Sequence, residues 1–110
     1  VAALLGPDPS PELVAEVQRI LRATQPGGFL HGVQLGVASG YSPEAVGAAA
    51  TMPVLLIQGR HDRVNPGDKN AAMLIKHLRN GRLEWLEDCG HLPEVEAPDI
   101  VNRMLRDFFG

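Results

Sequence analysis

Residues 53–66 read PVLLIQGRHDRVNP, where a short apolar run ends at a glycine and a carboxylate follows in the next turn. Val54 to Ile57 include no polar residue, which predicts an interior strand of a parallel sheet with both faces covered. In α/β proteins, ligands and catalytic groups lie in the loops that follow the carboxyl ends of such strands. Asp62 stands in that loop and is therefore the first candidate functional residue.

A second candidate follows another strand-like run, at residues 82–87, in the segment DCGHLP. We interpret its histidine, His91, as the partner of Asp62, because successive parallel strands end at the same edge of a sheet. In a Ser-His-Asp arrangement the aspartate orients the histidine ring, and the histidine acts as general base and then as general acid. The alternatives are an aspartate that binds its own backbone in a turn and a loop histidine without a special role.

The remaining pattern predicts an α/β fold. Helical periodicity and capping residues predict helices at 11–23, 29–39, 43–50 and 68–79 and from Pro98 to the end, with strands at 53–58 and 82–87. Residues 1–9 are interpreted as a linker, and Pro26-Gly27-Gly28 as a helix break. The order from residue 53 onward is β-α-β-α, a parallel crossover unit.

Two strands make a poor sheet, so we expect the chain to be the C-terminal end of a larger one. Residues 1–50 would be the end of lid-like helices and a connection, and residues 51–110 the C-terminal part of the core. The chain starts at Val1 rather than at methionine, which we interpret as a hint that it was cut from a longer protein, with processing as the alternative.

A nucleophile is the missing part of the arrangement. Ser10 and Ser42 are placed to cap helices, and Ser39 lies in GVASG, which has two residues where Gly-x-Ser-x-Gly has one. There is also no His-Gly-Gly-Gly-type segment for an oxyanion hole. We therefore expect the isolated chain to be inactive, since removing one triad member costs orders of magnitude in rate.

The other titratable residues are weaker candidates. His61 adjoins Asp62 and should point elsewhere, His77 is expected on the solvent side of a helix, and His31 is expected at the surface, although it could line a pocket. Cys89 is interpreted as a packing residue, and one cysteine provides no metal-binding spacing. No metal or cofactor is expected.

Composition is that of an ordinary globular protein: 110 residues, 45% hydrophobic and 21% charged, with a net charge of −3. Without a basic block, neither nucleic acid nor an anionic membrane is an expected partner. No apolar run reaches the roughly 18 residues of a membrane span. A single cysteine excludes an internal disulfide and, together with an N-terminus unlike a signal peptide, favours the cytoplasm.

Taken together, the acid loop and the histidine loop make residues 53–109 resemble the C-terminal part of members of the α/β-hydrolase fold family. Residues 53–66 are similar to the family's acid strand and loop, and residues 83–93 to its last strand and histidine loop. EVEAP at 94–98 and the closing Phe108-Phe109 are similar to its usual ending. The motif Gly-Arg-x-Asp-Arg-Val most resembles that of carbon–carbon bond hydrolases of ring-cleavage products and of enol-lactonases. Residues 11–50 resemble, more loosely, the end of a lid in such an enzyme.

The resemblance implies that Asp62 is the triad acid, that His91 is the triad base, and that Val64 and Leu92 face the acyl or leaving-group pocket. The chain departs from the family by lacking the part that would hold the nucleophile and the oxyanion hole. The expected function is that of a serine-type hydrolase of small esters, lactones or carbon–carbon bonds, present as its C-terminal portion and needing the N-terminal half. The alternatives are a non-catalytic remnant that binds a partner or self-associates, and a split enzyme whose second chain supplies the serine.

Overall fold

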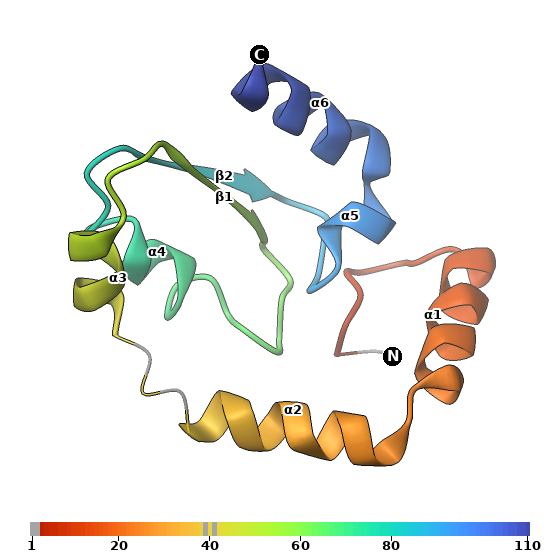
Figure 1. Cartoon of the computed structure of the whole chain (residues 1–110). Coiled ribbons are helices and arrows are strands. Elements are labelled where there is room, and N and C mark those ends of the chain that lie inside the picture. Colours follow the sequence, from red (N-terminus) through yellow and green to blue (C-terminus); the bar gives the residue numbers. More distant parts are fainter. Residues whose placement is uncertain (1–2, 39, 41) are drawn as a thin grey trace.

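The computed structural model describes residues 3–38, 40 and 42–110 (Figure 1). The elements follow the chain in the order expected for an α/β fold. They are α1 Pro11–Ala23, α2 Pro26–Ala38, α3 Pro43–Ala49, β1 Val54–Gly59, α4 Ala71–Leu74, β2 Gly81–Leu86, α5 Pro93–Glu96 and α6 Pro98–Phe109.

The two strands form a parallel pair, as the crossover pattern predicts. Val54 is the partner of Gly81 and Gly59 is the partner of Leu86, so both strands end at the same edge of the sheet. Each strand lies one residue away from its predicted bounds. The backbone pairing continues past the strands, since the His61 amide donates to the Cys89 carbonyl at 2.9 Å. This continuation brings the loops that follow β1 and β2 together.

The prediction that both faces of β1 are covered is wrong for the described chain. Its apolar residues 54–57 are only half-buried, and only Gln58 and Gly59 at its carboxyl end are buried. The reason is the small core: Leu86, Cys89 and Val101 are buried together, and Ile57, Ala97 and Met104 pack against them. Helix α6 supplies the packing on one face, and a two-stranded sheet leaves much of the rest without neighbours.

The first helices agree with their capping signals. Ser10 accepts from the Leu13 amide at 3.1 Å and begins α1, and Ser42 accepts from the Ala45 amide at 3.2 Å and begins α3. Helix α2 begins earlier than predicted, because Pro26 occupies its first turn, where proline is tolerated, instead of breaking a helix. The break falls at Thr24, the C-cap of α1.

The helix predicted at 68–79 is wrong in extent. Residues 66–70 instead form turns around the Pro66 carbonyl, which accepts from the amide of Lys69 and from the amide and side chain of Asn70. Helix α4 is one turn long, and the chain then turns again before β2. The short helix α5, which follows the histidine loop, was not predicted.

The N-terminal segment is not the free linker that its glycine and prolines indicate. Leu5 is 1% exposed, and the Leu4 carbonyl accepts from the His91 amide at 2.7 Å. Gly6 packs so closely on the Asp88 carbonyl that a Cβ there would overlap it. The segment has no regular structure, as predicted, but it is packed along the loop that carries His91.

The described chain is open in shape. Its radius of gyration is 15.4 Å, against about 13 Å for a compact domain of this length. Helix α2 runs along the opposite side of the molecule from α6 (Figure 1), and Phe29 and Leu30 on it are 65% and 58% exposed. Apolar helices normally bury such residues, so α2 exposes apolar surface that the rest of the described chain does not cover.

Gly59 should be essential for the close approach of the two loops. A Cβ at this position would overlap the carbonyl oxygens of Gly90 and Cys89, which are backbone atoms and cannot rotate away. We expect Gly59→Ala to destabilise the fold by about 3 kcal/mol or more, measured by urea unfolding. The matched control is Gly32→Ala in α2, where a Cβ meets nothing and alanine should stabilise by about 1 kcal/mol at most. Equal unfolding midpoints for the two variants would contradict the packing.

Candidate active site

Asp62 and His91 meet at the carboxyl edge of the sheet. The ring Nδ1 of His91 lies 2.9 Å from Oδ2 of Asp62, although the residues come from the loops after different strands. The aspartate is buried, with 8% of its side chain exposed, and the histidine side chain is 28% exposed. The structure therefore brings together the two residues that the sequence analysis paired.

The Asp62 carboxylate divides its hydrogen bonds between its two oxygens. Oδ1 accepts from the backbone amides of Val64 at 2.9 Å and Asn65 at 2.8 Å. Oδ2 accepts from the Gln58 side chain at 3.3 Å and faces the His91 ring. Asp62 thus binds its own backbone in the turn and also contacts the histidine, because the turn fixes the carboxylate that orients the ring.

These contacts set the charge of Asp62. Burial raises its pKa, but the hydrogen bonds from the Asn65 amide, the His91 ring and the Val64 amide outweigh burial, so that the pKa lies below its ordinary value. An ionised carboxylate only accepts hydrogen bonds, so Nδ1 of His91 must carry the proton. In this tautomer the lone pair of the ring is on Nε2, which has no hydrogen-bond partner in residues 3–38, 40 and 42–110. That is the tautomer that a general base requires.

The lowered pKa of Asp62 gives the fold a specific acid dependence. Because the folded pKa lies below the unfolded value, the stabilisation is complete above about pH 4 and is lost as the pH falls through the folded pKa. We expect the urea unfolding free energy to drop in this window, and Asp62→Asn to remove that part of the drop. Asp68→Asn, at an exposed position, is the control and should leave the drop in place. An unchanged acid profile in Asp62→Asn would contradict the assignment.

Backbone contacts hold the histidine loop on three successive residues. The His91 amide donates to Leu4, and the amides of Gly90 and Leu92 donate to the carboxylate of Glu96. Gly90 is required here, since a Cβ would lie 2.6 Å from the backbone carbonyl carbon of Leu5. The loop is therefore fixed by its own neighbours as well as by the ring contact.

Two residues of the site were missed by sequence reasoning. Gln58 is 9% exposed, and its Nε2 donates to the Gly59 carbonyl, to Asp62 and to the Asn65 carbonyl at 3.0–3.3 Å. A polar residue at the end of an apolar strand was a signal that could have identified it. Glu96 gave no comparable signal, because its partners are backbone amides that no sequence pattern marks.

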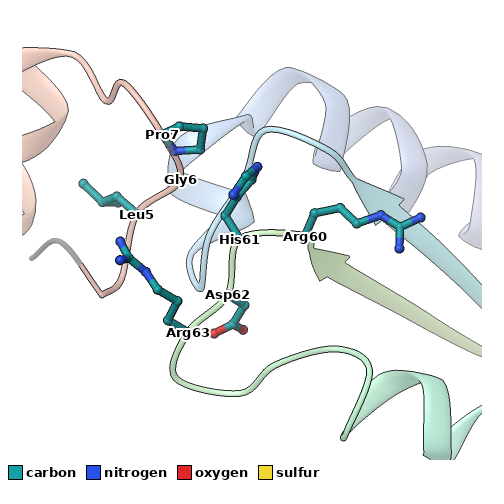
Figure 2. A pocket seen from close by; sticks show the side chains of 7 residues that line it. All are labelled: Leu5, Gly6, Pro7, Arg60, His61, Asp62 and Arg63. Carbon is teal, nitrogen blue, oxygen red and sulfur yellow. The ribbon is translucent and has the colours of Figure 1, made fainter.

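The weaker candidates lie apart from the pair. His61 points away from Asp62 (Figure 2), and His31 is exposed on α2. His77 lies beyond α4 rather than within a helix, with its Nε2 3.7 Å from Glu44. Cys89 packs in the core, and burial, together with the negative charges of Glu96 and Asp88, raises the pKa of its thiol, which agrees with a packing role.

The described serines do not supply a nucleophile. Ser10 and Ser42 cap helices as predicted, and neither contacts His91. Ser39 lies outside the described residues. In the described part of the chain, no group of three or more His, Cys, Asp or Glu residues could hold a metal ion. Nor does any described helix have the length and apolar character needed to cross a membrane.

An open cavity of about 370 Å³ lies beside the acid loop (Figure 2). The N-terminal segment forms one wall and the acid loop the other. Its lining residues are Leu5, Gly6, Pro7, Arg60, His61, Asp62 and Arg63. Val64 is 48% exposed and follows Asp62 by two residues in the same loop, and Leu92 is half-buried next to His91 in the sequence.

The parallel strand pair carries an acid and a histidine in the loops at its carboxyl edge, an arrangement that agrees with the C-terminal end of an α/β-hydrolase fold. No family model matches the chain. It is 34% identical over 65 residues to Protein ABHD8 of Mus musculus, and 41% identical over 58 residues to a 2-hydroxy-6-oxononadienedioate/2-hydroxy-6-oxononatrienedioate hydrolase of Dechloromonas aromatica. These matches cover 59% and 53% of this chain.

Among solved structures, the 2-hydroxy-6-oxo-6-phenylhexa-2,4-dienoate hydrolase of Rhodococcus sp. strain RHA1 superposes with a TM-score of 0.56 at 35% identity, over 63% of this chain. The chain has the fold of the C-terminal part of an α/β-hydrolase and is similar to members of that fold family. The matches span 15% of the mouse protein, 20% of the Dechloromonas hydrolase and 24% of the Rhodococcus chain.

Proposed function

We propose that this chain supplies the acid and the histidine of a serine-type hydrolase that cleaves ester, lactone or carbon–carbon bonds of small molecules. The observation that carries the proposal is the 2.9 Å contact between Nδ1 of His91 and the buried carboxylate of Asp62. It leaves Nε2 of the ring available for a proton. The similarity to two hydrolases named for 2-hydroxy-6-oxo acids supports the same class of reaction.

The chemistry follows from the tautomer. Nε2 of His91 takes the proton of a serine hydroxyl as the serine oxygen bonds to the substrate carbonyl carbon, and Asp62 stabilises the imidazolium that forms. The imidazolium then gives its proton to the leaving group as the bond to the carbonyl carbon breaks. In the second half of the reaction His91 takes a proton from water as the water oxygen bonds to the acyl carbon. His91 then returns the proton to the serine oxygen as the acyl–serine bond breaks and the acid is released. No metal or cofactor takes part in this scheme.

The serine of this scheme lies outside residues 1–110 in our proposal. The chain spans about a quarter or less of the relatives that it matches, which leaves room for a nucleophile elbow elsewhere in the protein. The partner of this chain would then be the N-terminal half of the same fold, in the same polypeptide or in a separate chain. Val64 and Leu92, next to the acid and the histidine, would contribute to the acyl or leaving-group pocket.

A second candidate function is that of a non-catalytic module that binds through its apolar surface. The exposed Phe29 and Leu30 and the open shape favour it, because such surface normally meets a partner. In a hydrolase the same surface would be covered by the rest of the protein. Self-association of the 110-residue chain, measured by sedimentation, is expected under either candidate and does not separate them.

Labelling with a fluorophosphonate probe separates the two candidates. In the full-length gene product we expect one probe adduct per molecule, on a serine within Gly-x-Ser-x-Gly, and none after heat denaturation. Peptide mass spectrometry locates the adduct. A folded protein without any adduct would overturn the hydrolase proposal and leave the binding module. An adduct on Ser10, Ser39 or Ser42 would overturn the proposed place of the nucleophile.

A further inference from the structure

The carboxylate of Glu96 binds backbone amides from two distant parts of the chain. Oε2 accepts from the amides of Gly90 at 2.9 Å and Leu92 at 3.2 Å, and Oε1 accepts from those of Gly90 at 3.1 Å and Gly6 at 2.5 Å. Gly90 and Leu92 are the residues on either side of His91. One side chain therefore fixes the histidine loop before and after the histidine.

We propose that Glu96 is the positioning residue of His91, and that it couples the N-terminal segment to the orientation of the imidazole. The inference deepens the proposed hydrolase function, because it assigns a role to a residue that touches neither substrate nor reacting atoms. Glu96 acts through the backbone. The ring contact with Asp62 then needs only the side-chain torsions of His91 to be set.

The local fold explains why the residue at this position can reach the loop. Helix α5 is a single turn with Leu92 as its N-cap, and the Glu96 amide donates to the Leu92 carbonyl at 2.9 Å. The Glu96 side chain also accepts from the Leu92 amide at 3.2 Å, so Glu96 is joined to Leu92 through both its backbone and its side chain. The turn thus holds the carboxylate within hydrogen-bond distance of the backbone amides of the histidine loop.

The chemistry of the contacts requires a carboxylate. All the partners of Glu96 are N–H donors, and both oxygens are in use. A glutamine would place its NH₂ group against at least one donor, leaving that backbone amide without an acceptor. The charge also strengthens these bonds relative to neutral ones. Removing the charge should therefore loosen the loop even when the shape of the side chain is kept.

The N-terminal segment is held by the same carboxylate. Gly6 donates to Glu96, and two residues earlier the Leu4 carbonyl accepts from the His91 amide. The backbone amides of Gly90, His91 and Leu92 are thus satisfied by Glu96, Leu4 and Glu96 in turn. A displacement of about 1 Å in a catalytic group can cost about 100-fold in rate, so this three-point attachment matters for a base that must meet a serine elsewhere.

The test uses the His91 ring itself as the readout. Nitrogen-15 NMR of the full chain reports which ring nitrogen carries the proton and how fast the Nδ1 proton exchanges with water. We expect wild-type protein to hold the proton on Nδ1, and Glu96→Ala to raise its exchange rate at least about tenfold, with a mixture of tautomers. Glu96→Gln should show the same change in smaller degree. Glu94→Ala, an exposed glutamate of the same helix, is the matched control and should behave as wild type.

A role in stability alone predicts a different result. Glu96→Ala would then unfold at a lower temperature while the ring, measured below that temperature, kept its tautomer and its exchange rate. That outcome, or a ring in both Glu96 variants within about twofold of Glu94→Ala, overturns the proposal. If Glu96→Ala does not fold, Glu96→Gln decides by the same criterion.

The result stands apart from the hydrolase proposal, because the ring signal requires no serine and no substrate. If Glu96→Ala changes the tautomer or the proton exchange rate of the His91 ring and the protein gives no fluorophosphonate adduct, the positioning role stands and the hydrolase proposal is overturned. If the ring is unchanged in Glu96→Ala and a serine adduct forms, the hydrolase proposal stands and the positioning role is overturned.

Discussion

In the hydrolase that we propose, His91→Ala should abolish activity of the full-length protein, lowering kcat/KM for a p-nitrophenyl ester or a 2-hydroxy-6-oxodienoate by about 10⁴-fold or more. Nε2 of His91 is the only site in the scheme that takes the serine proton and later returns it to the leaving group. Without the ring, the serine remains a hydroxyl with no base within reach. Fluorophosphonate labelling should disappear in parallel, since the probe reports the same activated serine.

The fold should survive this substitution. The backbone amide of His91 still donates to Leu4, and Glu96 still holds both neighbouring amides. His77→Ala is the matched control, because His77 pairs with Glu44 on another part of the molecule. A His91→Ala protein that retains more than about a tenth of the wild-type rate would show that another group is the base.

Asp62→Asn should lower kcat by about 10⁴-fold while changing KM much less. The asparagine removes the charge that stabilises the imidazolium. Its amide can also donate to Nδ1 of His91, which moves the ring proton to Nε2 and leaves no lone pair for the serine. The loss therefore comes from the wrong tautomer, with the ring still in place.

This second prediction has its own control and its own contradiction. Asp68→Asn changes the same charge at an exposed position and should leave kcat unaltered. The steady-state kinetics of the variants are compared at a pH above the range in which the Asp62 carboxylate takes up a proton. Equal losses in kcat and in the fluorophosphonate labelling rate are expected, and a loss confined to KM would mean that Asp62 binds substrate and does not orient the base.

The contact between Asp62 and His91 was predictable, and the particular residues show why. An apolar run of four residues that ends at Gly59 is a local signal, and it predicted both β1 and the loop that carries Asp62. His91 required one more inference, that two successive parallel strands end at the same edge, and the register confirms it. The helix caps at Ser10 and Ser42 were also local and are confirmed.

The errors have physical causes that a sequence does not carry. The helix expected at 68–79 has the right periodicity, but the turns around the Pro66 carbonyl replace its first part. The segment before Pro7 has linker composition and yet holds Leu5, the most deeply buried large side chain among the described residues. Composition records the propensity of a segment, whereas burial depends on what packs against it.

The amino-acid sequence by itself determined the parallel strand pair, the pairing of Asp62 with His91 and the likeness to α/β-hydrolases, because periodicity and turn residues are local properties and successive parallel strands end at one edge of a sheet. Only the tertiary structure decided which groups hold that pair in place. Glu96 and Gln58 act through backbone amides and carbonyls, which every residue possesses and no sequence distinguishes. Their roles therefore arise only when the folded chain brings those backbone groups within hydrogen-bond distance.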